Sequence, residues 1–564
     1  MRPTTPKGFR DILPNEALAR ERIIDSAKAC FAAHGYLPVE TPLLEDKSSI
    51  EQAGRIQDSP FQLFDTDDRL LILRPDLTLP IARMASARIR DEELPMRFRY
   101  VAPVVRESGD LKGQPRQFTQ LGVELIGEEG VTSELEVIHL LAELLSTLKV
   151  SGWKIVCGSV KPLLSLLETC APNENFLKEV LDLVHESDLV GLDKLVQTAD
   201  VSEAAKAALK LLPQLHGGVN VIDELDRLLA QAGVERKDSG IDTIRQLLAG
   251  LSDELESGRL SFDFSIINSF DYYTGIIFKA YSDQVAASLA SGGHYDAVFA
   301  NLGRNGVGAC GFACSLERLQ EAIAEHDETS TQGGANASVS GMAHRGVRMK
   351  DRPLRIAIPK GSLFKPTLEA LAGAGLDVSA LDDIGRRLII QTPEVDYVIV
   401  RAQDTPAFVA YGGADCGICG YDSLVEANIE LIHLVDLGFG WCKFIVAEPE
   451  AAAGQAEQAY EWRGSMRVVT KYPRITQAYY DRIGQQVDII KLHGNIELGP
   501  IIGMADRIVD ITATGTTLAE NNLVVVDDVM ECTARFFTSP AAYRSDPRIR
   551  ALADKLQDYV GDVQ

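Results

Sequence analysis

A run of small and hydroxylated residues near the C-terminus has the composition of a phosphate-binding loop. Segment 497–522 reads ELGPIIGMADRIVDITATGTTLAENN, in which a strand-like run, 508–511, leads through 512–517 into a helix-like stretch. Small residues after a strand leave backbone N–H groups free to face a phosphate at a helix N-terminus. Asp510 could hold ribose hydroxyls or reach Mg²⁺ through water. An ordinary strand–turn–helix connection has the same composition, so the loop alone leaves both interpretations open.

The segments around this loop alternate between strand-like and helix-like patterns. Strands are predicted at 354–358, 397–401, 416–418, 431–435, 443–447, 466–470 and 487–491. Helices are predicted at 364–373, 405–411 and 421–427. Regular alternation of this kind indicates an α/β fold with parallel strands.

The first part of the chain has a different order. An amphipathic helix is predicted at 17–33, followed by strands at 70–73, 97–105 and 118–126. Residues 132–256 are predicted to be mainly helical, strands return from Ser261, and a helix closes the part at 315–324. The pattern predicts an α+β core with an antiparallel sheet and a helical insertion at about 132–260.

Between the two parts lies a stretch without apolar periodicity. Residues 325–353 are rich in Ser, Thr, Gly, Ala and Asn, and such a segment cannot bury enough surface to fold. We therefore predict two domains, 1–324 and 354–564, joined by a flexible linker.

Bulk composition narrows the class of protein. The 564 residues carry a formal net charge of −25, which disfavours binding to nucleic acid, because phosphate neutralisation needs a basic surface. No run of apolar residues is long enough to cross a membrane, and the N-terminus lacks the apolar stretch of a secretory signal. The nine cysteines are scattered, and the CxxC of Cys416 and Cys419 has no second pair, so no metal-ligand set is predicted. A reducing, cytoplasmic compartment is the expectation.

Seven short motifs in the first part follow one another in a specific order. They are KGFRDILP, RPDLT (74–78), RFRYVAPVVRES (97–108), QFTQLGVELIG (117–127), DYYTG (271–275), GGHYD (292–296) and GFACSLERL (311–319). Together they resemble the class II synthetase core of the histidyl-tRNA synthetase family. Arg106 and Arg318 match its two signature arginines. The resemblance implies a histidine pocket lined by Asp76, Thr78, Arg106, Gln120, Glu124, Tyr272 and Tyr273.

This part departs from the synthetases where their chemistry is done. Asn268 stands where an arginine contacts the reacting carboxylate and phosphate, and Ser108, Gly109, Gln114 and Thr119 replace further motif residues. Exchanging arginine for asparagine removes a permanent charge and a forked donor, so adenylation should be lost. The predicted linker also stands where an anticodon-binding domain should follow. The pattern resembles the regulatory subunit of short-form ATP phosphoribosyltransferase, a synthetase paralogue that confers histidine feedback.

The second part resembles the catalytic subunit of that same family. Beyond the phosphate loop, the motifs are RIAIPKGSL (355–363), GRRLII (385–390), VRAQDTPAFVAYGGADCGICGYD (400–422), DLGFGWCKFIVAE (436–448) and VVTKYPRITQAYY (468–480). The resemblance implies an α/β fold with two lobes, like a periplasmic binding protein. It also implies transfer of the 5-phosphoribosyl group of phosphoribosyl pyrophosphate (PRPP) to N1 of ATP, with Mg²⁺ as cofactor.

Positioning and charge balance should carry this transfer, because its transition state resembles an oxocarbenium ion. The residues expected to balance the charge of the leaving group, and the two acids expected to orient them, are Lys360, Arg386 (or Arg387), Arg401, Asp415 and Glu497. The residues expected to hold the ribose and the 5′-phosphate of PRPP are Asp506, Asp510, Thr514, Gly515, Thr516 and Thr517.

The second part also departs from its family. Ser362 stands at an arginine position, Tyr421 at a lysine position and Ala513 at a glutamate position, while Thr516 replaces a common asparagine. Losing two cations and an anion would weaken binding of ATP or pyrophosphate, or mark a divergent branch.

These observations favour a fusion of a histidine-sensing unit with a transferase that makes N1-(5-phosphoribosyl)-ATP, the first step of histidine biosynthesis. Its expected ligands are ATP, PRPP and histidine as inhibitor, and its expected assembly is a homo-oligomer, a dimer or tetramer. One alternative is a ligase-like enzyme that still activates histidine, which Asn268 disfavours. Another is an inactive protein that binds nucleotide and histidine, which the departures at Ser362, Tyr421 and Ala513 keep open.

Overall fold

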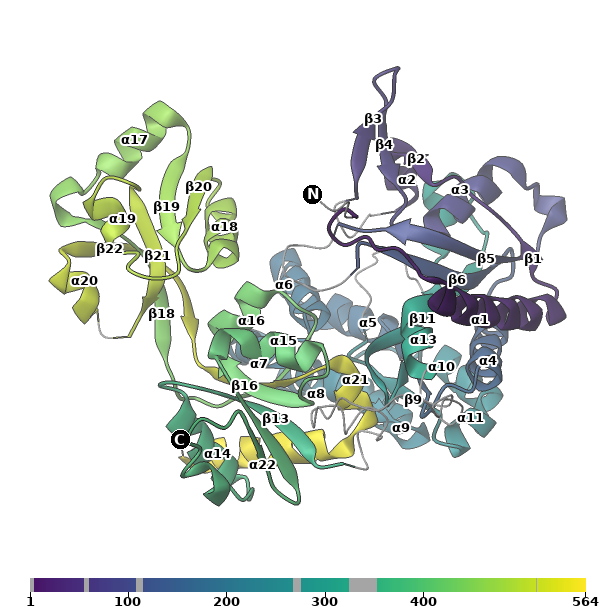
Figure 1. Ribbon diagram of the computed structural model, residues 1–564. Coiled ribbons are helices and arrows are strands. Elements are labelled where there is room, and N and C mark those ends of the chain that lie inside the picture. The colour runs from purple at the N-terminus through teal and green to yellow at the C-terminus, as the bar shows by residue number, and fades with distance from the viewer. Residues whose placement is uncertain are drawn as a thin grey trace. The chain divides into compact units, whose positions relative to one another are not determined.

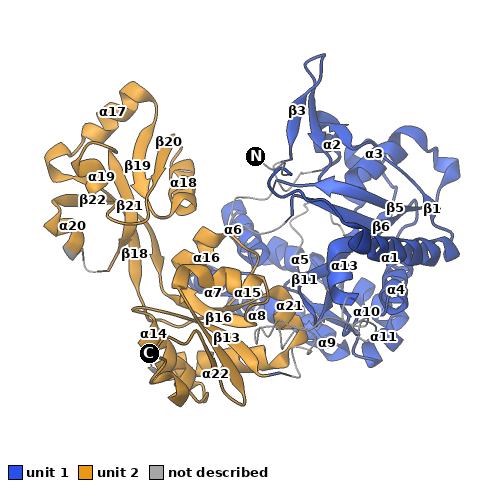
Figure 2. Cartoon of the chain, viewed as in Figure 1, with its two compact units in different colours: residues 1–352 blue, residues 353–564 orange. Residues whose placement is uncertain are grey.

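The computed structural model describes residues 5–54, 60–107, 115–266, 275–323, 352–513 and 515–563. It divides into two compact units, Met1–Arg352 and Pro353–Gln564, which Figure 2 colours separately. The predicted linker, 325–353, lies outside the described residues except for Arg352 and Pro353. Each unit has its own sheets and its own apolar core.

A nine-stranded sheet is the centre of the first unit (Figure 1). In spatial order its strands are β1 (Leu37–Pro38), β5 (Met96–Val105), β6 (Gln117–Ile126), β12 (Ala309–Ser315), β11 (Val285–His294), β10 (Ile276–Ser282), β7 (Lys154–Ser159), β9 (Leu260–Asp263) and β8 (His216–Gly217). The pairs β1–β5 and β7–β9 are parallel, and the others are antiparallel. The prediction of an α+β core with an antiparallel sheet is confirmed.

The helices of this unit cover the sheet and fill the long segment between β6 and β9. They are α1 (Pro14–Ala33), α2 (Lys47–Ala53), α3 (Thr78–Arg88), α4 (Val131–Thr147), α5 (Lys161–Cys170), α6 (Glu174–His185), α7 (Leu189–Thr198), α8 (Glu203–Leu211), α9 (Val219–Gln231), α10 (Ile241–Gly250), α11 (Ser252–Glu256), α12 (Asp296–Asn301) and α13 (Leu316–Ile323). A small second sheet contains β2 (Leu44–Asp46), β4 (Leu70–Leu73) and β3 (Gln62–Phe64).

The mainly helical prediction for 132–256 missed one strand of the main sheet. β7 lies between β10 and β9, inside the segment predicted as an insertion. Five of its six residues are buried, so the strand has no alternating pattern by which sequence could separate it from a buried helix.

The second unit contains two mixed sheets. The first has the order β14 (Ile389–Gln391), β15 (Val395–Val400), β13 (Leu354–Pro359), β16 (Cys416–Gly420), β23 (Ala534–Thr538) and β17 (Ile432–Asp436). The second has the order β20 (Val487–Lys491), β19 (Met466–Thr470), β21 (Arg507–Thr512), β18 (Cys442–Pro449) and β22 (Leu523–Cys532). The helices are α14 (Phe364–Gly373), α15 (Thr405–Ala410), α16 (Tyr421–Ala427), α17 (Gln455–Arg463), α18 (Pro473–Arg482), α19 (Leu498–Ile501), α20 (Thr516–Glu520), α21 (Pro540–Ser545) and α22 (Pro547–Val563).

The α/β class of this unit is confirmed, but its strands are not all parallel as the alternation suggested. β13, β15 and β16 are parallel, as are β19, β20 and β21, whereas β14, β17, β18, β22 and β23 make antiparallel pairs. β22 and β23 were not predicted. β22 exposes much of its length and continues into β23 through Thr533 alone, so no turn signal marks the boundary.

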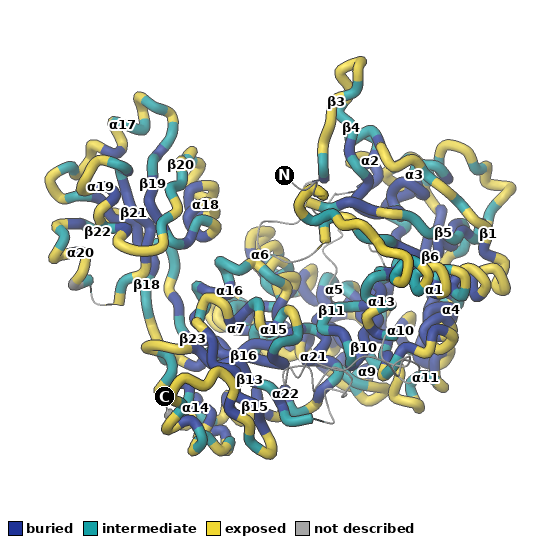
Figure 3. The backbone as a smooth tube through the Cα atoms, in the orientation of Figure 1, coloured by how far each residue is buried: buried dark blue, intermediate teal, exposed yellow. Residues whose placement is uncertain are grey.

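The chain passes between the two sheets of the second unit twice. Residues 437–441 connect β17 to β18, and Thr533 connects β22 to β23. Figure 3 shows buried backbone along β6, β10 and β13, and exposed backbone along β3. Within the described ranges, none of the helices has the length and apolar character needed to cross a membrane.

Replacing a buried aromatic ring of the first unit should destabilise it. Phe312 of β12 is buried, and its ring makes an edge contact with Phe31 of α1 at a centroid distance of 5.8 Å. Phe312→Ala should lower the free energy of unfolding of this unit by about 3–5 kcal/mol. Phe64→Ala is the matched control, because Phe64 is 74% exposed. Denaturant titrations of both variants that moved the unfolding midpoint equally would contradict this packing.

Candidate functional site

β6 carries two predicted pocket residues on one face. Gln120 and Glu124 are four residues apart on a strand, so their side chains point the same way. Both are buried, and Glu124 is only 1% exposed. Gly311 of β12 is opposite Glu124, and a Cβ there would lie 1.9 Å from Glu124 Oε2. A glycine on the neighbouring strand therefore leaves the space that the carboxyl group occupies.

Three hydroxyl groups converge on the Glu124 carboxyl group. Thr78 Oγ1 donates to Oε1 at 2.9 Å, Tyr295 OH donates to Oε2 at 2.6 Å, and Tyr100 OH lies 3.3 Å from Oε1. Burial raises the pKa of Glu124 to about 7, although the three hydroxyl groups favour the ionised form. The carboxyl group is held in one position and is poised to titrate near neutral pH.

A second acid and an amide oxygen share this region. Asp76, just before α3, accepts a hydrogen bond from Leu79 N at 3.1 Å, and burial raises its pKa. The charge of Asp76 also raises the pKa of Glu124. Gln120 Oε1 is buried without a hydrogen-bond partner among the described residues. This set of acceptors suits a small cationic ligand with N–H donors.

The predicted arginines are anchored by backbone carbonyls. Arg106 Nε donates to Pro75 O at 2.8 Å, and its guanidinium lies 5.1 Å from the centre of the Phe118 ring. Arg318 donates to Ser288 O at 2.7 Å. Tyr272, Tyr273 and the departure Asn268 lie in 267–274, outside the described residues.

Sequence reasoning missed Tyr100 and Tyr295, although both stand in the quoted motifs. Tyr100 is opposite Gly122, which lies between Gln120 and Glu124 on the same face of β6, so strand pairing could have placed it in the pocket. Tyr295 follows β11 and is fully buried, and its position could not be derived from local sequence.

His294, the neighbour of Tyr295, is buried between the side chains of Glu134 and the half-exposed Asp296. Its ring nitrogens lie 3.3 Å from Glu134 Oε1 and 2.6 Å from Asp296 Oδ1. Burial lowers the pKa of His294, but the two carboxylates outweigh burial and raise it to about 9. The imidazolium form therefore persists at neutral pH.

In the second unit, predicted cations meet at the carboxyl edge of the first sheet. Lys360 follows β13 and Arg401 follows β15; the two strands are parallel neighbours, and Lys360 N donates to Val400 O at 2.7 Å. Arg386 lies in the turn before β14, whose antiparallel pairing with β15 returns it to the same edge. All three residues are exposed, so the edge presents a group of positive charges.

Acidic and loop residues meet at the carboxyl edge of the second sheet. Asp510 is near the end of β21, and Lys471, which follows β19, brings Nζ to 3.7 Å from Asp510 Oδ2. Burial raises the pKa of Asp510, and the charge of Glu497 adds to that shift. Asp510 Oδ1 is buried without a hydrogen-bond partner among the described residues. Lys471 was missed, although it follows a buried strand just as Lys360 does.

The phosphate loop follows Asp510 directly. Gly515 has φ +73° and donates its N–H to Thr512 Oγ1 at 2.9 Å, immediately before α20. This left-handed backbone favours glycine. Thr517 is exposed in α20, which begins at Thr516, and Thr514 lies outside the described residues.

The carboxyl edges of the two sheets converge at the two connections between the sheets, residues 437–441 and Thr533, which we call the crossing segments. Lys443 of β18 is opposite Thr512, and Ala534 of β23 is opposite Gly420. Glu426 of α16 accepts hydrogen bonds from Arg474 N and Ile475 N at the start of α18, each at 3.1 Å. The helices that follow β16 and β19 therefore touch, which brings both groups of candidate residues to one region.

Two predicted acids lie at the opposite ends of their strands. Asp415 precedes β16 and accepts from Arg355 N at 2.8 Å, so it cannot orient Lys360 or Arg401 as predicted. Asp506 precedes β21, roughly 13 Å of strand before Asp510. Sequence proximity misplaced both residues, because parallel strands gather the residues that follow them and separate those that precede them.

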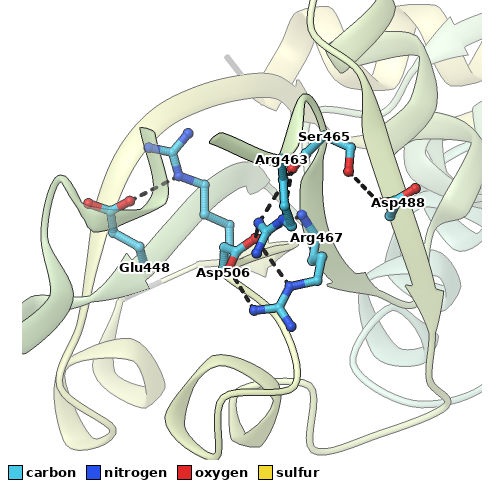
Figure 4. Close-up of polar contacts among 7 residues, drawn as sticks. Glu448, Arg463, Ser465, Arg467, Asp488 and Asp506 are labelled. Atoms are coloured by element: carbon cyan, nitrogen blue, oxygen red, sulfur yellow. Dashed lines mark hydrogen bonds and ion pairs between the residues drawn. The ribbon is translucent and has the colours of Figure 1, made fainter. Parts of the chain in front are cut away.

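Figure 4 shows what Asp506 does instead. Arg467 donates to it from the backbone N–H at 3.0 Å and from the guanidinium at 2.9 Å, and Arg463 forms a second ion pair. Burial opposes ionisation of Asp506, but its bonds to Arg467 prevail and lower its pKa. The carboxylate holds α17, β19 and β21 together and has a structural role.

The side chains of three departures in the second unit can be described. Ser362 and Ala513 are exposed. The ring of Tyr421 lies beneath the guanidinium of Arg535, at 5.1 Å from the ring centre, and Arg535 is buried and paired with Asp436. Arg535 thus places a cation beside Tyr421, the position where the family has lysine, but Asp436 already neutralises that charge. In the described part of the chain, no three His, Cys, Asp or Glu side chains gather as a metal site.

Comparison with known proteins agrees with the division of the chain into two units. The histidyl-tRNA synthetase family model matches residues 8–319, and the ATP phosphoribosyltransferase family model matches residues 401–558. An ATP phosphoribosyltransferase from Rubrobacter xylanophilus is 45% identical over 193 residues, which cover 34% of this chain and 89% of that protein. An ATP phosphoribosyltransferase regulatory subunit from Desulfitobacterium hafniense is 34% identical over 319 residues, which cover 57% of this chain and 82% of that protein.

A solved structure extends the comparison to the fold. The crystal structure of an ATP phosphoribosyltransferase regulatory subunit/histidyl-tRNA synthetase from Bacillus halodurans matches with a TM-score of 0.53 and 27% identity, covering 70% of this chain and 98% of that one. The first unit thus has the class II synthetase fold, and the second is a phosphoribosyltransferase.

The chain belongs to the ATP phosphoribosyltransferase family and joins a regulatory-subunit-like unit of the histidyl-tRNA synthetase family to a catalytic unit. The predicted enzyme class, and with it the first step of histidine biosynthesis, is confirmed.

Exchanging Asp506, just before β21, and Asp510, within β21, should separate structure from substrate binding. Asp506→Asn should lower the free energy of unfolding by about 1–3 kcal/mol, because it removes charged hydrogen bonds to Arg467. The pKa of Asp506 is lowered in the fold, so this stabilisation is present above the unfolded pKa of about 4 and is lost as pH falls below it. Asp510→Asn should instead raise the KM for PRPP. A large KM effect in Asp506→Asn with unchanged stability would reverse these assignments.

Proposed function

We propose that the first unit binds histidine in the Glu124 pocket and thereby inhibits phosphoribosyl transfer in the second unit. The observation that carries the proposal is the buried Glu124 carboxyl group, which is fixed by Thr78, Tyr100 and Tyr295. Asp76, Gln120 and Glu124 would accept the ammonium and imidazole N–H groups of histidine, and Arg106 would face its carboxylate. Tyr272 and Tyr273, which lie outside the described residues, are assigned to the same pocket by the resemblance alone.

In the second unit, the proposed reaction transfers the 5-phosphoribosyl group of PRPP to ATP. The lone pair of adenine N1 forms a bond to C1 of the ribose as the bond from C1 to the pyrophosphate oxygen breaks. Lys360, Arg386 and Arg401 would stabilise the charge that develops on the leaving pyrophosphate. The exposure of these residues at one sheet edge supports this role.

The other carboxyl edge would hold the phosphoribosyl group. Asp510, whose Oδ1 has no partner among the described residues, would accept from ribose hydroxyls, and Lys471 would set its orientation. Backbone N–H groups of 514–517 would face the 5′-phosphate, with the N-terminus of α20 behind them. Glu497 is close enough to affect Asp510 and would share its task.

Mg²⁺ is part of the proposal. Its charge would neutralise the diphosphate of PRPP when bound. Oxygen donors suit this ion, and the partnerless Oδ1 of Asp510 fits a water-mediated contact. We also propose a cytoplasmic homo-oligomer, a dimer or tetramer, because synthetase cores dimerise.

Removing the Glu124 carboxyl group should separate inhibition from catalysis. The rate of phosphoribosyl-ATP formation from ATP, PRPP and Mg²⁺ would be followed by absorbance, with and without histidine. Glu124→Ala should keep its uninhibited rate and lose inhibition, because the main acceptor for the ligand is gone. Glu203→Ala is the control, since the Glu203 side chain is 89% exposed on α8. Inhibition retained in Glu124→Ala would refute the pocket assignment.

Histidine affinity should depend on pH through Glu124. The ionised carboxylate attracts the ammonium group of histidine, so affinity should be highest above a pKa of about 7 and should fall by up to about tenfold per pH unit below it. Calorimetric titration from pH 5.5 to 8.5 would measure the effect. Glu124→Gln controls for titration of the histidine imidazole itself, and coincident profiles for this variant and the wild type would contradict the assignment.

A further inference from the structure

Two cysteines face each other where the chain crosses between the sheets of the second unit. Cys442 is the first residue of β18, Cys532 is the last residue of β22, and the two are register partners in the antiparallel pair. The nine cysteines all lie in the described part of the chain, and these are the two that a strand register pairs. Neither cysteine is in a disulfide in this structure.

The spacing of such partners suits a disulfide. Directly opposed residues in an antiparallel pair have Cα atoms about 4.5 or 5.5 Å apart, and disulfides span about 4.4–6.8 Å. Cys532 is buried in the apolar cluster that includes Phe444 and Tyr472, and Cys442 packs against the same cluster. The two sulfurs therefore lie on one face of the ribbon, and a bond between them would need little movement.

The other cysteine neighbours fail this test. Cys416 and Cys419 are three residues apart on β16, so they point to opposite faces. Cys310 and Cys314 share a face of β12 but are roughly 13 Å apart along the strand.

A disulfide between Cys442 and Cys532 would affect the two connections between the sheets. Residues 437–441, just before Cys442, and Thr533, just after Cys532, are the two connections between the sheets. The carboxyl edges that carry the candidate catalytic residues meet at these same connections. A bond from 442 to 532 would close the two connections into a ring and limit rotation of one sheet relative to the other.

We propose that Cys442 and Cys532 form a reversible disulfide that restrains the two crossing connections and slows the transferase. The oxidant class is a low-molecular-weight disulfide such as oxidised glutathione. The Cys442 thiolate attacks one sulfur of the oxidant, which forms a mixed disulfide and releases one glutathione thiolate. Cys532 loses its proton and attacks Sγ of Cys442, which releases the second glutathione. Two protein thiols and one oxidised glutathione thus become one protein disulfide and two glutathiones.

The environment of each thiol suits its part in this sequence. Cys442 is half-buried and reachable from solvent, whereas Cys532 is buried. The hydrogen bond between the two thiols lowers the pKa of Cys442 and raises that of Cys532. Cys442 is therefore the thiol that a dissolved oxidant can reach first, as the attacking thiol must be.

The test uses the full chain. The reduced protein is incubated with oxidised glutathione, free thiols are alkylated, and the digest is analysed by mass spectrometry, while phosphoribosyl-ATP formation is measured on the same samples. We expect a linked peptide joining Cys442 and Cys532, together with loss of most of the turnover. Dithiothreitol should then remove the linked peptide and restore the turnover.

Matched variants make the result specific. Cys442→Ala should be insensitive to the oxidant, whereas Cys170→Ser should behave like the wild type, because Cys170 is also half-buried but faces no other cysteine in a strand register. Absence of the linked peptide from the oxidised wild type, or its presence with undiminished turnover, would overturn the proposal. The wild-type digest decides this even if Cys442→Ala folds poorly.

Discussion

Burial of one carboxyl group, that of Glu124, organises the first unit. Removing a carboxylate from water is costly, and the fold offsets the cost with three hydroxyl groups donated by α3, β5 and the residue that follows β11. Those elements must stay in register for the hydroxyls to reach, and Gly311 must lack a side chain for the carboxyl group to fit. Even so, the pKa of Glu124 is raised to about 7, so the pocket gains most from a ligand that brings a positive charge.

The direction of parallel strands organises the second unit in a comparable way. Residues that follow β13, β15, β19 and β21 meet at the crossing segments, whereas residues that precede β16 and β21 are locked into the opposite edge. Charged side chains stand both after and before these strands, but the two groups have different contacts. We propose that Lys360, Arg401, Asp510 and Lys471 bind the ligands, whereas Asp415 and Asp506 form hydrogen bonds within the fold. The same geometry places the Cys442–Cys532 pair between the two groups of candidate residues.

Sequence predicted the order of elements well, because turns, linkers and apolar periodicity are local signals. It failed where a strand is uniformly buried, as in β7, or continues without a turn, as from β22 to β23. For the site, motifs identified residues such as Gln120, Glu124 and Asp510, which the structure buries beside other candidate residues. The motifs did not distinguish Asp506 from Asp510, four residues away, because a sequence does not show which end of a strand faces the site. Tyr295 and Lys471 were missed because their neighbours in space come from distant strands.

Hydrogen exchange on the intact chain would show whether histidine binding in the first unit is coupled to the transferase in the second. Amide exchange would be followed by mass spectrometry with and without saturating histidine. If the two units are coupled, histidine should slow exchange in peptides covering 117–126 of the first unit and change exchange in peptides covering 508–522 of the second. A change confined to the first unit, or no change at all, would contradict this coupling.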